Sequence, residues 1–241
     1  MTETRTITLP IRDLHNAVKN IMHFAPKTLP KNANHLPLDG AHLVARRGTL
    51  VLEATDTAKM MQVNISADTA VTFGDDISDE IPDQSFGIIG AEDLKEIELA
   101  LRDTAKIKDE PLPIAELVCT EDSITVGELN NSDDDSSITY DLITDQRFPD
   151  VDRLLTAFDF DKAPESVLNV YDPMHFKALT TVSDTRATRK NQSLSLAFDA
   201  KRKAVAVHWI SQGEVWAQGL FMPLIKPMVN PGVDLFKAVQ F

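Results

Sequence analysis

Three successive stretches of the 241-residue chain repeat one pattern of apolar and polar positions. Each stretch begins with a short alternating segment and continues into a segment with apolar residues three and four apart. Three more alternating segments complete it. Alternation is typical of strands, and a spacing of three or four is typical of amphipathic helices. The pattern therefore predicts three β-α-β-β-β units that repeat every roughly 80 residues.

Helix-start signals support these units. Pro10 precedes the first expected helix, and Asp172 with Pro173 supplies a cap and a first-turn proline for the third. The expected helices cover residues 11–25, 91–108 and 172–185. The expected strands cover residues 6–10, 40–46, 49–55, 59–66, 85–90, 115–121, 122–129, 136–143, 166–171, 194–201, 204–211 and 214–224.

The connections between the units differ in character. Residues 72–84 are acidic and contain a proline, which predicts a solvated loop. Residues 143–155, ITDQRFPDVDRLL, are too apolar for a plain linker and too interrupted for a strand or a helix. We therefore expect a two-unit domain at 1–147, a linker at 148–165, a third unit at 166–226 and a tail at 227–241.

Composition and cysteine usage are those of a globular protein, with 43% hydrophobic and 25% charged residues. No apolar run is long enough to span a membrane, and the first residues lack a signal-peptide pattern, so we expect a cytoplasmic protein. The single cysteine, Cys119, is expected in the core. It leaves no partner for an intramolecular disulfide.

The net charge of −13 argues against a nucleic-acid partner, but a net charge is a sum that can conceal a sorted distribution. Residues 12–27, 92–108 and 173–190 together hold 11 Lys or Arg against 7 Asp or Glu. Helical spacing places Arg12, His15, Lys19 and His23 on one stripe and Lys95, Leu99, Arg102 and Lys106 on another.

These stripes predict a cationic helix side that contacts the backbone of duplex DNA without sequence choice. The alternative is an ordinary solvated helix face with locally paired charges, and it stays open. The residues expected to face DNA are Arg12, Lys19, Lys95, Arg102, Lys106, Lys177, Arg186, Arg189 and Lys190.

Three local segments resemble a known family. They are LEATDTAKMMQV (52–63), QRFPDVDRLL (146–155) and LFMPLIK (220–226). Together with the repeated unit, they resemble the bacterial sliding clamps, the beta subunits of DNA polymerase III. The resemblance implies an α+β DNA-clamp fold with antiparallel sheets outside and helices inside. It also implies a processivity factor without enzymatic activity or cofactor, which encircles duplex DNA and tethers a polymerase and a clamp loader.

In this family, partner proteins insert short apolar peptides into a surface groove. By motif position, the resemblance implies a groove made of Thr55, Lys59, Met60, Pro149, Leu154, Met222, Pro223 and Leu224. Ala58 departs from the histidine that the family often has. The tail sequence VDLF resembles such a peptide, so Leu235 and Phe236 are either a groove ligand or a part of the chain's own core.

The number of units also departs from the family, whose chains have three domains of two units and close as dimers. Three units in this chain favour a homo-oligomer, and four copies would supply twelve units. A clamp-like protein that regulates or mimics replication proteins without encircling DNA is the alternative. A metal-dependent enzyme at Asp133, Asp134 and Asp135 is not expected, because this turn lacks a bidentate Glu and a His partner. No Gly-rich phosphate loop or nucleophile elbow occurs either.

Overall fold

The structure of the chain is a computed structural model. It describes residues 3–25, 39–56, 59–73, 76–78, 83–108, 110–129, 137–156, 173–187, 191–198 and 204–222. In chain order the elements are β1 (Glu3–Pro10), α1 (Ile11–Ile21), β2 (Gly40–Arg46), β3 (Thr49–Thr55), β4 (Lys59–Ser66), β5 (Asp68–Phe73), β6 (Asp76–Ser78), β7 (Gln84–Gly90), α2 (Ala91–Leu101), the 3-10 helix η1 (Thr104–Lys106), β8 (Ile114–Cys119), β9 (Ser123–Glu128), β10 (Ile138–Ile143), α3 (Val151–Leu155), α4 (Pro173–Thr181), β11 (Gln192–Phe198), β12 (Val205–Ser211) and β13 (Glu214–Phe221).

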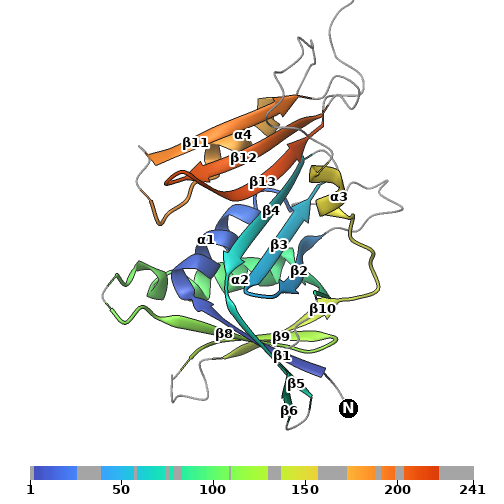
Figure 1. Cartoon of the computed structure of the whole chain (residues 1–241), viewed down its shortest axis with the longest axis vertical. Coiled ribbons are helices and arrows are strands. Elements are labelled where there is room, and N and C mark those ends of the chain that lie inside the picture. Colours follow the sequence, from blue (N-terminus) through green and yellow to red (C-terminus); the bar gives the residue numbers. More distant parts are fainter. Residues whose placement is uncertain are drawn as a thin grey trace, which may run out of the picture.

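The described strands form one antiparallel sheet of 13 strands, which bends around the helices (Figure 1). Its order is β11-β12-β13-β4-β3-β2-β7-β10-β9-β8-β1-β5-β6. The first unit (β1 to β4) and the second unit (β7 to β10) pair with each other through equivalent strands. β1 pairs with β8, the first strand after α2, and β7 pairs with β2, the first strand after α1. Each unit thus completes the sheet of the other in an approximately two-fold arrangement.

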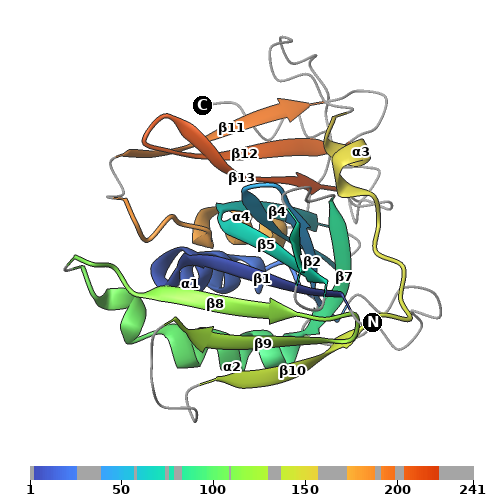
Figure 2. The same ribbon diagram turned by 60° about the horizontal axis from the view of Figure 1, so that its bottom comes forward.

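Alternate residues of the sheet face two different layers. On one face, Met61 and Val207 join a core that includes α1, α2 and α4. On the other face, Met60 and Ala206 contact residues of α3. Figures 1 and 2 show α1, α2 and α4 together on one side of the sheet. We call that side the helix side and the opposite side, which carries α3, the outer side.

The architecture confirms the expected α+β fold with an antiparallel sheet and helices packed against it. Cys119 is fully buried in this core, and burial raises the pKa of its thiol to about 12. Within the described residues, no helix is long and apolar enough to cross a membrane. The domain boundaries stay a prediction.

Two expectations about the connections are wrong. The chain continues beyond β4 into β5 and β6, where a solvated loop was expected from residue 72 onward. Pairing of β5 with β1 explains the difference, because the backbone of β1 from Glu3 to Thr8 provides β5 with hydrogen-bond partners that the local sequence does not reveal. The linker also contains a helix, α3. Asp150 caps it, since its side chain accepts a hydrogen bond from the Arg153 amide at 3.0 Å.

The third unit (α4 and β11 to β13) is joined to the first unit by both a sheet contact and polar side chains. β13 pairs with β4, so the sheet runs through the junction. Asn20 of α1 accepts a hydrogen bond from the Ser183 amide and donates one to the Ser183 carbonyl, both at 3.0 Å. Asn16 accepts hydrogen bonds from the Thr185 amide and hydroxyl at 2.9 Å. Both asparagines are buried. Their side-chain amides therefore provide the hydrogen bonds that the backbone after α4 would otherwise form with water.

The substitution Asn20→Ala is expected to lower the free energy of unfolding by about 1–3 kcal/mol, because it leaves both polar groups of Ser183 without this partner. Asn64→Ala is the matched control, since Asn64 is exposed on β4, and it should change stability by less than about 0.5 kcal/mol. Urea unfolding followed by circular dichroism measures both. Equal effects of the two substitutions would contradict this account of the junction.

Candidate peptide groove and DNA-facing surface

Three segments far apart in the sequence meet on the outer side of the sheet. They contribute an apolar cluster, which we call the outer cluster, and Phe148 packs against it. Its members are Met60 of β4, Val151 and Leu155 of α3, Ala197 of β11, Ala206 of β12 and Leu220 of β13. The pairing of Met60 with Leu220 across the β4–β13 contact brings the first and third units together here. The same three segments carry the predicted groove residues.

Two of the predicted groove residues build the turn between β3 and β4. Thr55 is buried, and its hydroxyl donates to the Lys59 carbonyl at 2.9 Å. The Lys59 ammonium donates to the His23 carbonyl and to Asp56 Oδ2, both at 2.7 Å, and it lies 5.3 Å from the centre of the Phe24 ring. Only 12% of the Lys59 side chain is exposed. These two residues therefore shape the backbone beside Met60 and present little surface of their own.

The exposed apolar side chains lie at the margins of the outer cluster. Leu154 is 39% exposed beside the buried Leu155, and Met222 is 43% exposed just after the residue that pairs with Lys59. Pro149 is half-buried in the linker. The other predicted positions, Pro223, Leu224, Leu235 and Phe236, lie outside the described residues. The structure thus combines a buried apolar floor with two exposed apolar neighbours.

A polar network fixes α3 over this floor. Asp152 accepts hydrogen bonds from Arg46 and, at 2.8 Å, from Gln62. Gln62 also donates to Glu53 at 2.7 Å and accepts from Gln218 of β13 at 2.6 Å. Glu53 and Gln62 are only 4% and 1% exposed, so each needs these partners. The network therefore links the linker to β3, β4 and β13 at one place.

The linker has a second attachment through His42. The imidazole of His42 stacks on Phe148 with ring centres 4.7 Å apart. Its nitrogens lie 2.9 Å from Glu53 Oε2 and 2.6 Å from Ser85 Oγ. The aromatic ring at the start of the linker is therefore held on β2 by His42, which also connects it to Glu53 of the network around Gln62.

The helix side exposes six of the nine residues expected to face DNA. They are Arg12, Lys19, Lys95, Arg102, Lys106 and Lys177. The side chain of Arg186 is only 28% exposed, and Arg189 and Lys190 lie outside the described residues. The buried faces of α1 and α2 pack on the sheet, and Lys19 and Lys95 lie on the exposed faces of these helices, whereas Arg12 lines a cleft between α1 and the sheet. The exposed cations of α1, α2 and α4 thus belong to helices of one side of the sheet, and a contact of these residues with DNA stays a prediction.

Carboxylates already pair with several of these cations. Arg102 donates to Glu98 at 2.6 Å, and Lys106 donates to Asp103 at 2.7 Å. Lys19, Lys95 and Lys177, in contrast, form no ion pair with the residues that the structure describes. The pair of Lys106 with Asp103 is solvent-exposed, and such pairs contribute about 0–1 kcal/mol, so a polyanion could replace Asp103 at low cost. Glu98 is only 8% exposed, so its pair with Arg102 is harder to replace.

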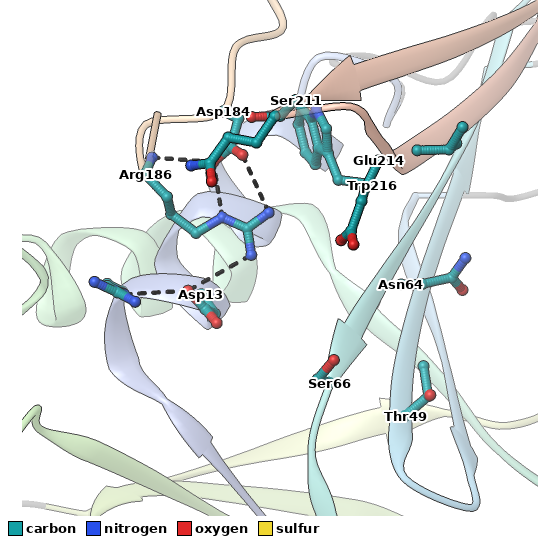
Figure 3. Close-up of a pocket in the computed structure, with 12 residues that line it drawn as sticks. Asp13, Thr49, Asn64, Ser66, Asp184, Arg186, Ser211, Glu214 and Trp216 are labelled. Atoms are coloured by element: carbon teal, nitrogen blue, oxygen red, sulfur yellow. Dashed lines mark hydrogen bonds and ion pairs between the residues drawn. The ribbon is translucent and has the colours of Figure 1, made fainter. Parts of the chain in front are cut away.

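A polar cleft of about 420 Å³ lies where the first and third units meet (Figure 3). In it, Arg186 donates to Asp184 at 2.7 Å and lies 3.6 Å from Asp13, which is 3.5 Å from Arg12. Burial alone would raise the pKa of Asp184, but hydrogen bonds, above all from Arg186, hold it below its usual value. Arg186 therefore serves the junction, and only 28% of its side chain is exposed.

The expected stripe on the first helix is wrong at His15. This residue is 9% exposed between α1 and α2, where its Nε2 lies 3.2 Å from Glu98 Oε1. Burial lowers the pKa of His15, although the hydrogen bond to Glu98 opposes the shift. The hydrogen bond from Arg102 is the main cause that lowers the pKa of Glu98. Spacing alone could not show that α2 covers this part of α1.

Solved structures with the same arrangement come from bacterial replication proteins. A putative DNA polymerase III beta subunit from Eubacterium rectale ATCC 33656 superposes with a TM-score of 0.62 at 12% identity, over 92% of this chain and 66% of that one. The DNA polymerase sliding clamp from Pseudomonas aeruginosa gives a TM-score of 0.55 at 13% identity, over 91% and 66%. The chain has the fold of the bacterial sliding clamps.

The similarity to these sliding clamps covers less than two thirds of their length. A scan against protein-family models and a search of curated proteins found no match to this sequence. At 12–13% identity the similarity establishes the clamp fold alone, so the individual site residues stay predictions.

Several residues of the clamp-like outer side were not predicted from the sequence. Among them are Leu155, Ala206 and Leu220 of the cluster floor and Glu53 and Gln62 of the network. The alternation in β13 does contain a signal, because Leu220 and Phe221 must face opposite layers. No local signal shows that Glu53 and Gln62 would be buried under α3. Among the described residues, no group of three metal-binding side chains occurs, and Asp133, Asp134 and Asp135 lie outside them.

Acidification is expected to weaken the contact between α1 and α2. The pKa of His15 is lowered from 6.5 in the folded protein, so below about pH 6.5 the unfolded chain binds more protons and stability falls. His15→Gln removes this titration while keeping a donor for Glu98. The decrease in melting temperature from pH 7.5 to pH 5.5 should therefore be smaller in the variant. Burial also lowers the pKa of His208, so some pH dependence should remain. Equal decreases in both proteins would contradict the role of His15.

Proposed function

We propose that this chain is a DNA sliding clamp, a polymerase processivity factor that surrounds duplex DNA as a homo-oligomer. It binds replication proteins through a peptide groove over the outer cluster and performs no chemistry of its own. Attachment to a ring on the template raises the local concentration of a polymerase at the primer end, which is sufficient for processivity.

The convergence of β4, α3 and β13 is the observation that carries this proposal. These segments hold the three motifs that resemble the clamp family, and they meet at the outer cluster. A peptide with two adjacent apolar side chains could insert them between the exposed Leu154 and Met222. Burial of a few such anchors supplies most of the affinity in many protein interfaces.

The distribution of charge supports the proposed contact with DNA. Six exposed cations lie on the helix side of a chain whose net charge is −13. Contacts of Lys and Arg with phosphate oxygens depend on charge and not on base sequence. The sheet separates these cations from the acidic residues elsewhere in the chain. We therefore expect DNA to bind on the helix side alone.

A clamp-like binding protein that does not encircle DNA is the second candidate. The pairing of Arg102 with Glu98 and of Lys106 with Asp103 favours it, because paired cations attract a polyanion less strongly. Retention on DNA distinguishes the two candidates. A closed ring stays on nicked circular DNA and slides off the ends of linear DNA, whereas a non-encircling protein treats both alike.

Charge reversal on the helix side is expected to reduce this retention. The double variant Lys19→Glu/Lys95→Glu should lose at least about tenfold in affinity for duplex DNA at 50 mM salt, with a weaker salt dependence. Arg47→Glu, at the exposed turn between β2 and β3, makes the same charge change for one residue away from the helices and is the control. Electrophoretic mobility shifts on one duplex measure the affinities. If Arg47→Glu reduced binding as strongly per charge, a specific role of the helix side would be refuted.

Substitutions at the margins of the outer cluster are expected to abolish peptide binding. Leu154→Glu or Met222→Glu should weaken binding at least about tenfold, since each places a charge where an apolar side chain enters. The probe is a fluorescent peptide with the sequence of residues 230–241, which contains VDLF. Ile138→Glu is the control, because Ile138 is 43% exposed on β10, far from this cluster in the sheet. Unchanged fluorescence anisotropy in both cluster variants would count against a groove at this place.

A further inference from the structure

The two strands that join the first and third units separate before either of them ends. The pairing of β13 with β4 stops at Ala217 opposite Val63. β4 nevertheless continues to Ser66, and β13 already begins at Glu214. The polar cleft of about 420 Å³ lies between these diverging ends (Figure 3). Its volume is in the range of about 300–1,000 Å³ that is usual for small-ligand sites, and both units line it.

The cleft contains more negative than positive charge. Its charged residues are Arg12, Asp13, Asp184, Arg186 and Glu214, which are three carboxylates and two guanidinium groups. Arg186 donates to Asp184 at 2.7 Å, and both arginines lie within 3.6 Å of Asp13. Glu214, in contrast, forms no ion pair with a residue that the structure describes. The cleft is therefore complementary to a cation, which Glu214 would receive.

Two buried oxygens of the cleft also have no hydrogen-bond donor among the described residues. They are Asp13 Oδ1 and Ser211 Oγ. Arg12 and Arg186 approach Asp13 Oδ1 only to 3.5 and 3.6 Å, which is too far for a good hydrogen bond. Ser211 is 5% exposed, and a hydroxyl oxygen has two acceptor lone pairs. Because buried polar atoms are nearly always hydrogen-bonded, these oxygens indicate a donor from outside the chain.

The wall of the cleft on the first unit offers further acceptors. Thr49 of β3 lies opposite Ser66 of β4, so their side chains share one face, and Asn64 follows on the same face of β4. No hydrogen bond joins these three side chains to a described residue. On the third unit, Val215 is 49% exposed in the cleft and provides apolar surface. A ligand thus meets oxygen acceptors on two walls and an apolar patch beside them.

A guanidinium group matches this arrangement better than an ammonium group does. Its five donors lie in one plane, so two of them can bind a carboxylate while the others reach acceptors on the opposite side. An ammonium group has three donors around a single point charge. The methylene stem of an arginine also packs on apolar surface while its head stays among polar groups. The chemistry of the cleft therefore favours arginine over lysine.

We propose that this cleft binds an arginine side chain of a partner protein. The guanidinium group lies between Glu214 of the third unit and the wall formed by Thr49, Asn64 and Ser66 of the first, and its stem packs on Val215. A side chain bound in this way contacts both units and strengthens their junction. The site lies beyond the end of the β4–β13 pairing, and it shares no residue with the outer cluster. The inference depends neither on the proposed groove nor on the proposed DNA role.

A capped arginine, Nα-acetyl-arginine N-methylamide, tests the site in the 241-residue protein. Titration followed by NMR should shift the amides of residues 64–66 and 211–216, with a dissociation constant of about 1 mM or lower. The citrulline analogue has nearly the same shape without the charge, and it should bind at least about tenfold more weakly. Equal affinities of the two probes, or shifts that leave both of these segments unchanged, would overturn the proposal.

A pair of substitutions identifies the carboxylate. Glu214→Gln should weaken binding of the capped arginine at least about fivefold, because the neutral amide loses the charge-assisted hydrogen bonds. Glu121→Gln makes the same charge change at the exposed turn between β8 and β9, and it should leave the affinity unchanged. Unchanged binding by the Glu214 variant, or equal weakening by both, would refute the assignment.

Inorganic phosphate distinguishes a cation site from an anion site. Phosphate should shift the amides of residues 64–66 and 211–216 only weakly, and tighter binding of phosphate than of the capped arginine would also overturn the proposal. Should the Glu214 variant fail to fold, the comparison of the arginine and citrulline probes on the wild-type protein decides. None of these titrations involves DNA or an apolar peptide, so their outcome is separate from the tests of the proposed function.

Discussion

The antiparallel pairing of β4 with β13 is the contact on which the rest of the structure depends. It joins segments that are about 156 residues apart, as the hydrogen bond between Gln62 and Gln218 shows. Since successive residues of a strand point to opposite faces, this one contact determines both layers. Met61 and Phe221 enter the core beside α1, while Met60 and Leu220 form the floor of the outer cluster. A register shift by one residue would exchange the two sets and destroy both layers.

Buried polar groups make that register specific. Apolar residues of similar size can pack in more than one way, but Gln62 and Glu53 satisfy their hydrogen bonds only when Gln218 and Asp152 lie beside them. On the other face, Asn16 and Asn20 have a similar role toward the segment after α4. The junction of the first and third units is therefore selected by polar groups on both faces and stabilised by the apolar residues between them.

The sequence predicts the repeated units well because their signals are local. Alternation locates the described strands of the three units to within a few residues, and prolines locate the starts of α1 and α4. The strand expected at 166–171 lies outside the described residues. The errors arise where a distant segment decides the outcome. β5 is a strand because β1 offers it an edge, and His15 is buried because α2 packs over it. α3 forms through one local cap at Asp150, in a segment whose periodicity is too short to indicate a helix.

The candidate site shows the same limit more clearly. The motifs lie on three segments that meet at the outer cluster, but only the structure distinguishes Leu154, which is exposed, from Leu155, which is buried in the floor. It also reassigns Lys59, whose ammonium is held by the His23 carbonyl and by Asp56. A residue that resembles a family's binding residue in sequence can thus stabilise the local backbone instead of contacting a partner.

If the chain is the proposed sliding clamp, weak ion pairing of the cations on the helix side would help it to slide along DNA. Lys19 and Lys95 have no ion pair among the described residues, and Lys106 loses little free energy if a phosphate replaces the exposed Asp103. A protein that must move along DNA needs many such weak, equivalent contacts, since a single strong contact would hold it at one phosphate. Screening by salt over about 8–10 Å keeps each contact short-ranged. In the proposed role, a modest positive charge on the helix side is therefore an advantage. Such a charge attracts the DNA duplex without holding it at one position.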